Sequence, residues 1–212
     1  MVSSYIANVF RNTSSYLKAT YILACVEASG HSNSGEIYSR ALRYPICGRT
    51  VFEIIRGLLR DRKLDPKSSI ELPRRLFRSL IPANGREWSD QDYPLPFLRD
   101  IYDTPDFQVI HVDEGYALAK AVYVQFTPLV KFLLDKGTSP KSKDGIAVKI
   151  AIRLNDLDMF KMLVGSWPSI KSPKKEIAKS MMELAILSGA SEIVGFYRAK
   201  GVVPNIEVLR NL

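Results

Sequence analysis

Cysteine and histidine are both scarce in this chain of 212 residues, which holds two of each. Cys25 and Cys47 are too few for a disulfide framework, and they form no Cys-x-x-Cys pair that would hold zinc. His31 and His111 have no second histidine or cysteine at ligand spacing, so no metal site and no cofactor is expected. Because both cysteines lie in apolar surroundings, we expect buried, reduced thiols and an intracellular location.

Long apolar runs are missing as well. No run reaches the roughly 18 uncharged apolar residues that a transmembrane helix needs, so no membrane insertion is expected. Lys18 and Ser14-Ser15 interrupt the apolar residues near the start, which argues against a secretory leader. Residues 1–26 contain Arg11 and Lys18 but no acid, a composition that fits an organellar transit peptide or an ordinary first helix. The expected location is cytoplasmic or nuclear, with mitochondria as the alternative.

Sequence signatures of catalysis are absent too. The chain has no Gly-x-Ser-x-Gly elbow, no His-Glu-x-x-His helix and no Gly-x-x-x-x-Gly-Lys-Ser/Thr phosphate loop. Two carboxylate pairs, Asp90 with Asp92 and Asp156 with Asp158, occur in turn-like contexts. Helix capping explains such pairs better than acid–base chemistry. We therefore predict a protein that is not an enzyme.

Apolar residues at helical spacing dominate what is present. They predict helices over residues 3–28 (in two pieces), 36–44, 50–62, 73–80 and 96–102. Ser14 or Thr13 caps the second piece of the first helix. The residues expected to face inward from that piece are Tyr16, Leu17, Tyr21, Ile22, Cys25 and Val26. The best strand candidate is 107–112.

Residues 82–112 differ in texture from the sequence on either side. They hold four prolines and five aromatic residues, which predicts an extended connector anchored by aromatic side chains. The sequence therefore predicts three regions. These are a helical, arginine-rich region over 1–81, the connector over 82–112, and a regular helical region over 113–212.

The region after residue 113 repeats itself with offsets of 30 and 34 residues. One column of small residues lets neighbouring helices approach, and it consists of Ala121, Ala151 and Ala185. Bulky columns follow eight, nine and twelve residues later, at Leu129/Met159/Ile193, Val130/Phe160/Val194 and Leu133/Leu163/Tyr197. Gly137 and Gly201 fall where a left-handed C-cap ends the second helix. Asn155 and Gly189 fall between the two helices of a pair, where a positive φ is tolerated.

This pattern resembles the ankyrin repeat. The best copy is 182–189 (MELAILSG) followed by Ile193-Val194 and Gly201, and residues 127–137 resemble a second helix with its glycine ending. The Thr-Pro-Leu-His opening of the family is missing from every copy, and the middle copy has Trp167 in place of the final glycine. The resemblance covers about 115–204. It implies an all-α helical-hairpin solenoid of about three ankyrin-like repeats, preceded by an irregular helical half, and a surface that binds other proteins.

Positive charge is concentrated in one stretch of the chain. The net charge is +8, and residues 40–78 alone hold eleven basic and four acidic residues. Four of the basic residues share one helical face, and guanidinium groups suit phosphate or carboxylate partners. The candidate contacts with a partner or nucleic acid are Arg40, Arg43, Arg49, Arg56, Arg60, Arg62, Lys63, Arg74, Arg75 and Arg78.

Two main functional interpretations follow from these patterns, beside an enzyme with a divergent site and a basic surface that is only solvated. The favoured one is a non-enzymatic scaffold protein, whose ankyrin-like repeats bind a protein partner and whose basic surface contacts that partner's acidic surface. The alternative is an RNA-contacting structural component of a ribonucleoprotein complex, such as an organellar ribosome. DNA binding would use the same arginines. The sequence does not identify the partner or the oligomeric state.

Overall fold

The computed structural model of the protein describes residues 13–30, 33–62, 67–83, 85–110, 115–165 and 175–203. This part of the chain contains 11 helices and one sheet of two strands. The helical class agrees with the sequence, and the sheet is an addition to the expected all-α fold. The chain divides into two compact units, Met1–Leu76 with Tyr93–Val112 and Phe77–Asp92 with Asp113–Leu212. The three regions expected from the sequence remain a prediction.

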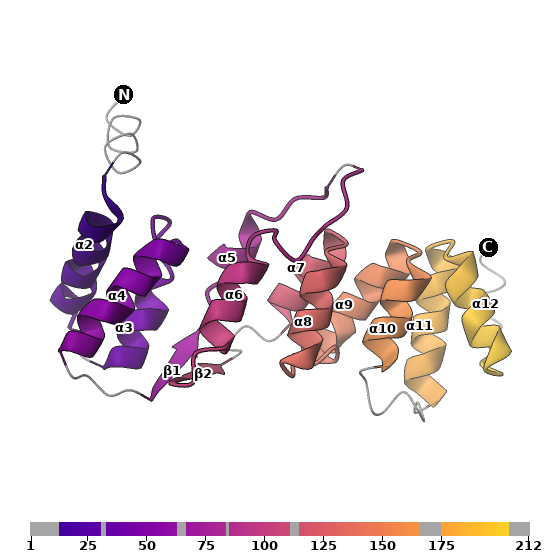
Figure 1. The fold of residues 1–212 in the computed structure, drawn as a ribbon. Helices are drawn as coiled ribbons and strands as arrows, with labels where there is room; N and C mark the ends of the chain where they lie inside the picture. The colour runs from indigo at the N-terminus through magenta and orange to yellow at the C-terminus, as the bar shows by residue number, and fades with distance from the viewer. Residues whose placement is uncertain are drawn as a thin grey trace. The chain divides into compact units, whose positions relative to one another are not determined.

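The first unit begins with three helices, α2 (Ser15–Ala28), α3 (Ser34–Ala41) and α4 (Arg49–Asp61). α2 contacts both α3 and α4 (Figure 1). It begins at the predicted cap, because the Ser14 hydroxyl accepts a hydrogen bond from the Leu17 N–H at 3.3 Å. α4 confirms the helix predicted over 50–62 to within one residue at each end.

The buried face of α2 differs from the prediction. Its buried residues are Ala19, Ile22, Leu23 and Val26. Tyr16, Leu17 and Tyr21 were expected inside, but 56%, 58% and 47% of their surface is exposed. The reason is that α2 carries apolar residues on nearly all sides, so its sequence does not mark which side meets α3 and α4. Cys25 is half-buried and Cys47 is buried, and both are free thiols.

The sheet consists of β1 (Ser68–Glu71) and β2 (Phe107–Ile110). The strands run parallel, with Ser68 opposite Phe107 and Glu71 opposite Ile110. β2 lies inside the strand predicted over 107–112, whereas β1 was not predicted. Because parallel strands cannot be joined by a tight turn, α5 (Arg75–Arg78) and α6 (Leu95–Tyr102) lie between them in the sequence.

α3 lies directly against β1. The hydroxyls of Ser34 and Ser68 share a buried hydrogen bond of 2.7 Å. Gly35 permits this close approach, because a Cβ atom there would lie 2.6 Å from the carbonyl oxygen of Ser69. A glycine is therefore needed in α3 for packing against the strand, although its own φ is not left-handed.

Aromatic rings join α3, α4, α6 and β2 in the core of the first unit. The ring of Phe52 lies 5.6 Å from that of Tyr38, 5.6 Å from that of Phe97 and 6.1 Å from that of Phe107, measured between centroids. Phe107 also meets the Tyr38 ring edge-on at 4.9 Å. Such edge-to-face pairs are the favoured geometry of aromatic rings, and they fix β2 against the two helices.

Helical hairpins make up most of the second unit. They are α7 (Tyr116–Tyr123) with α8 (Thr127–Asp135), α9 (Ser142–Arg153) with α10 (Leu157–Gly165), and α11 (Lys175–Leu187) with α12 (Ser191–Ala199). The first helices of the hairpins are neighbours, since α9 contacts both α7 and α11. The second helices are neighbours as well, since α10 contacts both α8 and α12 (Figure 1). The helices of the second unit thus form two rows, one of α7, α9 and α11 and the other of α8, α10 and α12.

One turn geometry recurs in all three hairpins. The residues between the paired helices have left-handed φ angles of 56°, 51° and 68° at Gln125, Asn155 and Gly189. The following N–H bonds back to the carbonyl of the alanine column, at 2.9, 3.1 and 2.8 Å for Ala121, Ala151 and Ala185. This is the Schellman arrangement, which satisfies carbonyls at the end of the first helix. The predicted left-handed positions at Asn155 and Gly189 are confirmed.

The second helices end as the sequence predicts. Gly137 and Gly201 have φ angles of 87° and 72°. The N–H of Thr138 bonds to the carbonyl of Leu133 at 2.9 Å, and that of Val202 bonds to Tyr197 at 3.1 Å. α8 and α12 therefore end in the same glycine cap.

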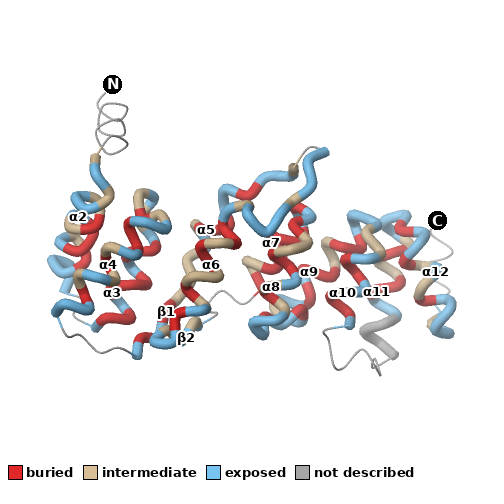
Figure 2. The backbone as a smooth tube through the Cα atoms, viewed as in Figure 1, coloured by how far each residue is buried: buried red, intermediate tan, exposed pale blue. Residues whose placement is uncertain are grey.

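Every helix of the second unit from α7 to α12 contains buried residues (Figure 2), and most residues of the repeat's columns are among them. The alanine column is completely buried, with 0% exposure at Ala121, Ala151 and Ala185. Every member of the three bulky columns is buried except Val194, which is half-buried. The register of the three hairpins thus agrees with the sequence, while an ankyrin-like solenoid remains a prediction.

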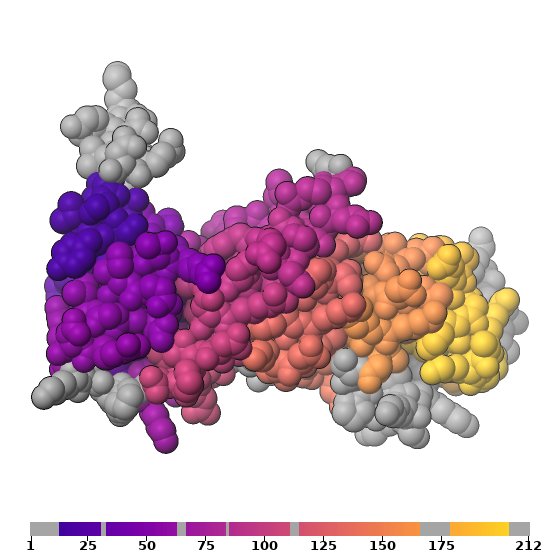
Figure 3. Space-filling view, in the orientation of Figure 1, coloured from indigo at the N-terminus to yellow at the C-terminus, as the bar shows by residue number. Residues whose placement is uncertain are grey.

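The segment Phe77–Asp92 belongs to the second unit although the first unit continues after it at Tyr93, and we call this segment the excursion. Its Trp88 packs against the hairpin of α7 and α8. The ring of Trp88 stacks on that of Phe126, with centroids 4.5 Å apart and planes 11° from parallel. The Trp88 indole N–H donates to the carbonyl of Val124 at 2.8 Å. In the space-filling view the excursion lies against the α7–α8 hairpin (Figure 3). Trp88 therefore covers the turn between α7 and α8.

Candidate partner-binding surfaces

The basic residues predicted as partner contacts differ in exposure. Arg56 and Arg75 are half-buried. Lys63 lies outside the described residues. The exposed members are Arg40, Arg43, Arg49, Arg60, Arg62, Arg74 and Arg78. All the described members belong to the first unit except Arg78, which falls in the second.

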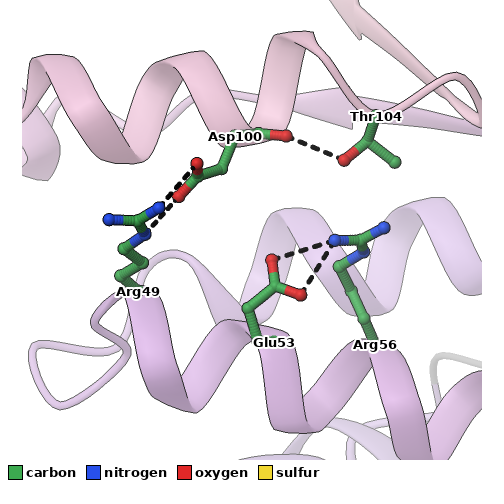
Figure 4. A network of polar contacts seen from close by, with 5 residues as sticks. All are labelled: Arg49, Glu53, Arg56, Asp100 and Thr104. Carbon is green, nitrogen blue, oxygen red and sulfur yellow. Dashed lines mark hydrogen bonds and ion pairs between the residues drawn. The ribbon is translucent and has the colours of Figure 1, made fainter.

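Three of the exposed arginines pair with carboxylates of the first unit. Arg43 lies 3.3 Å from Glu71, and Arg62 pairs with Glu27. Arg49 holds Asp100 through two contacts, Nε to Oδ2 at 2.5 Å and Nη2 to Oδ1 at 3.0 Å (Figure 4). Exposed pairs of this kind contribute only about 0–1 kcal/mol to stability, so a partner's carboxylate can compete for them.

Arg56 is held more firmly than its neighbours on α4. Its Nη1 lies 2.9 Å from both carboxylate oxygens of Glu53, one turn earlier on the same helix (Figure 4). The guanidinium carbon lies 5.2 Å from the centroid of the Phe107 ring, a cation–π contact. Only 17% of the Arg56 side chain is exposed. The guanidinium of Arg56 therefore makes its main contacts within the first unit and is poorly accessible to a partner.

Arg75 donates hydrogen bonds to backbone carbonyls. Its guanidinium donates to the carbonyl of Leu42 at 3.0 and 3.1 Å and to that of Cys47 at 3.1 Å. These carbonyls follow the end of α3, where a cation is favourable. Burial raises the pKa of the Cys47 thiol to about 12, against a smaller opposite effect of Arg75. The thiol of Cys47 is therefore protonated at neutral pH.

Arg40 and Arg60 of the first unit are exposed and make no ion pair within the described chain. Arg78 of the second unit makes none either. Burial raises the pKa of the Tyr38 hydroxyl, while Arg56 and Arg60 lower it, so both guanidinium groups act on this hydroxyl. Of the ten basic residues predicted as partner contacts, only some are therefore exposed and without an ion pair in the described chain.

A second surface lies on the outward side of α7, α9 and α11, and we call it the first-helix face. Its apolar residues, two from each helix, are Tyr116, Tyr123, Ile146, Ile150, Leu184 and Leu187. Exposure reaches 50% at Tyr123, 39% at Ile146 and 65% at Leu187. Within each helix the two residues are three, four or seven positions apart, which places them on one side. This face was not predicted from the sequence, because the repeat is marked only by its buried columns.

Charged side chains on the first-helix face are mostly basic. Lys120, Lys149 and Arg153 stand among the apolar residues, with Glu183 as the acidic one. The ammonium of Lys120 lies 5.2 Å from the centroid of the Tyr123 ring. The face therefore combines apolar surface with an excess of positive charge.

One member of each carboxylate pair noted in the sequence has a local structural role. The Asp156 carboxylate accepts the N–H of Met159 at 2.9 Å, which caps α10. Asp92 accepts the N–H of Ser89 at 2.7 Å. This hydrogen bond, with the Ser89 hydroxyl and Arg86, holds the pKa of the Asp92 carboxyl below its usual range. The structure thus confirms capping for Asp156 and a turn contact for Asp92.

Within the described ranges no group of three or more His, Cys, Asp or Glu residues is arranged to hold a metal ion. Both histidines, His31 and His111, lie outside those ranges. Among the described helices, none combines the length and the hydropathy that crossing a membrane requires. Comparison with protein-family models, with curated proteins and with solved structures finds no match for this chain.

Proposed function

We propose that the protein is a non-enzymatic interaction module, which binds an acidic protein partner through ankyrin-like helical hairpins and a basic surface. The observation that carries the proposal is the recurrence of one turn geometry and one buried alanine column in three hairpins. Such hairpins cannot bury their apolar sides alone, and stacking them produces an extended surface.

Preformed structure supports binding in this proposal. The hairpin turns are held by backbone hydrogen bonds, and the columns between the helices are buried. Because little of this surface has to be ordered when a partner arrives, the entropic cost of association is low. Surface complementarity would then decide which partner is bound.

The distribution of ion pairs favours a protein partner over RNA. In the first unit Glu27, Glu53, Glu71 and Asp100 each pair with an arginine that the sequence assigned to the surface. RNA binding depends on many cations that can each meet a phosphate. A protein partner needs only a few charged contacts at fixed positions. The ribonucleoprotein reading remains the alternative.

Charge reversal of Arg40 and Arg60 tests the assigned basic surface. We expect the variant R40E/R60E to bind fluorescein-labelled poly-L-glutamate about tenfold more weakly than the wild type, in a fluorescence anisotropy titration. Both side chains are exposed, so the helical circular dichroism spectrum should not change.

A matched control keeps net charge constant between the variants. Lys131 on α8 and Arg198 on α12 are exposed and make no ion pair within the described chain. K131E/R198E should lose affinity by no more than about threefold, because only the general field of the protein changes. Equal losses in the two variants would show that poly-L-glutamate responds to net charge alone and would reject the assigned surface.

A further inference from the structure

We infer that the first-helix face binds a segment of a protein partner in which bulky apolar residues stand beside Asp or Glu. This inference rests on the proposed function for the class of partner. It goes beyond that function by assigning a second surface, in the second unit, and the chemistry of the segment bound there.

The apolar part of the face is continuous across three helices. α9 contacts α7 on one side and α11 on the other, so their outward sides adjoin. Equivalent positions of the repeat carry Tyr116 and Ile146 in one line and Ile150 and Leu184 in the next. A soluble surface seldom keeps such residues together in the open unless they meet another molecule.

The charges on the face select among possible occupants. Lys149 and Arg153 make no ion pair within the described chain, and Lys120 lies over the ring of Tyr123. Among the described residues of the face, Glu183 alone offsets them. A second copy of this chain would bring the basic groups of two first-helix faces together, which is unfavourable. A partner with acidic residues beside its apolar ones meets both features of the face.

Nucleic acid fits this face less well than a peptide does. Its phosphates would meet Lys120, Lys149 and Arg153 while the aliphatic side chains between them lay against a highly charged backbone. Only α7 offers rings on which a base could stack, at Tyr116 and Tyr123. The other four apolar residues of the face, Ile146, Ile150, Leu184 and Leu187, are aliphatic and offer none. Apolar peptide side chains, by contrast, would cover these residues and exclude water from them.

Selection from a display library of random linear peptides against the full chain provides an unbiased probe. We expect the enriched peptides to combine Leu, Phe or Trp with Asp or Glu. Binding of a synthetic enriched peptide should fall about tenfold in K149E/R153E and to a similar extent in Y123S/L187S. Tyr123, Arg153 and Leu187 are exposed and Lys149 is half-buried, and none of the four belongs to the buried columns, so these variants should keep the wild-type melting temperature.

Matched controls separate this surface from others. K131E/R198E changes charge on the second helices, and L17S/Y21S removes two exposed apolar side chains from α2. Both should bind the peptide as the wild type does. Enrichment of peptides without acids, failure to enrich any peptide, or equal binding to Y123S/L187S would overturn the inference.

One outcome separates the inference from the proposed function. Suppose that the enriched peptides bind K149E/R153E and Y123S/L187S as they bind the wild type, but do not bind R40E/R60E. The peptide-binding site would then not lie on α7, α9 and α11, and the inference would be wrong. The same result would leave the basic surface of the first unit in place as the contact with an acidic partner.

Discussion

Arginine performs three different tasks in the first unit. Arg75 donates to the carbonyls of Leu42 and Cys47, Arg56 is held by Glu53 and Phe107, and Arg60 is exposed without an ion pair. The side chain has five donors in a planar fork, and that is why it suits a carbonyl, a carboxylate or an aromatic face. Residue type alone therefore does not reveal which arginines are available to a partner.

Gly35 is the residue whose replacement the structure tolerates least easily in α3. A Cβ atom there would lie 2.6 Å from the backbone oxygen of Ser69, which cannot move without disturbing β1. We expect Gly35→Ala to lower the free energy of unfolding by about 1–3 kcal/mol, measured by urea denaturation.

Gly57 in α4 serves as the control for this substitution. No atom lies within 4 Å of a Cβ built at Gly57, and the residue is exposed within the helix. Gly57→Ala should raise the free energy of unfolding by about 0.5–1 kcal/mol, because alanine favours the helix. Equal stability of the two variants would mean that α3 does not approach β1 as closely as described.

Single residues were predictable from the sequence where a repeat defined their surroundings. Ala121, Ala151 and Ala185 could be placed in the core because three copies agreed. Tyr16 and Leu17 could not, because α2 has no second copy and its apolar residues surround the helix. The pairing of Arg49 with Asp100 joins residues far apart in the sequence, and no local pattern indicates it.

At the scale of the helical hairpin, the alanine column sets how closely the helices pack. Ala185 is fully buried in α11, and its carbonyl accepts the N–H of Ala190 in the turn. We expect Ala185→Arg to lower the free energy of unfolding by several kcal/mol, because a long charged side chain would be forced into a filled interior. Thermal and urea unfolding would both report the loss.

Ala199, the last residue of α12, is the matched control for the substitution in α11. It is exposed, so Ala199→Arg should change stability by no more than about 0.5 kcal/mol. If the protein tolerated Ala185→Arg equally well, the register of the repeat would be wrong.

Among the elements, helices were predictable and β1 was not. α4 and α6 were found because apolar residues recur at helical spacing over two turns or more. β1 has the sequence Ser-Ser-Ile-Glu, which is too short to show alternation. Its partner β2 begins at Phe107, and the contact that stabilises β1 is therefore remote in the sequence.

Across the whole molecule, arginine and lysine are unevenly distributed. Residues before 111 hold 12 arginines and 3 lysines, and residues after it hold 3 arginines and 12 lysines. Five of the arginines pair with carboxylates, so the count of 30 basic residues overstates the cations that a phosphate backbone could meet. Binding to single-stranded RNA should accordingly be weak and only moderately sensitive to salt.

The slope of log K against log salt measures the number of phosphates engaged. If Arg40, Arg60 and Arg78, three exposed candidate residues without an ion pair in the described chain, each meet a phosphate, we expect a slope of about −2 for a mixed-sequence RNA, from roughly 0.7 per phosphate contact. Fluorescence anisotropy with protein stripped of nucleic acid would give this value. A slope near −7, which corresponds to all ten basic residues, would favour the ribonucleoprotein alternative.

The order of residues in the two units has a consequence for synthesis. The first unit needs Tyr93–Val112, and the excursion Phe77–Asp92 that carries Trp88 belongs to the second unit. A nascent chain therefore exposes Trp88 before α7 and α8, its packing partners, have left the ribosome. The first unit also stays incomplete until its last segment emerges. Folding of the two units during translation is thus interleaved, and a chain shortened before residue 93 would lack part of both.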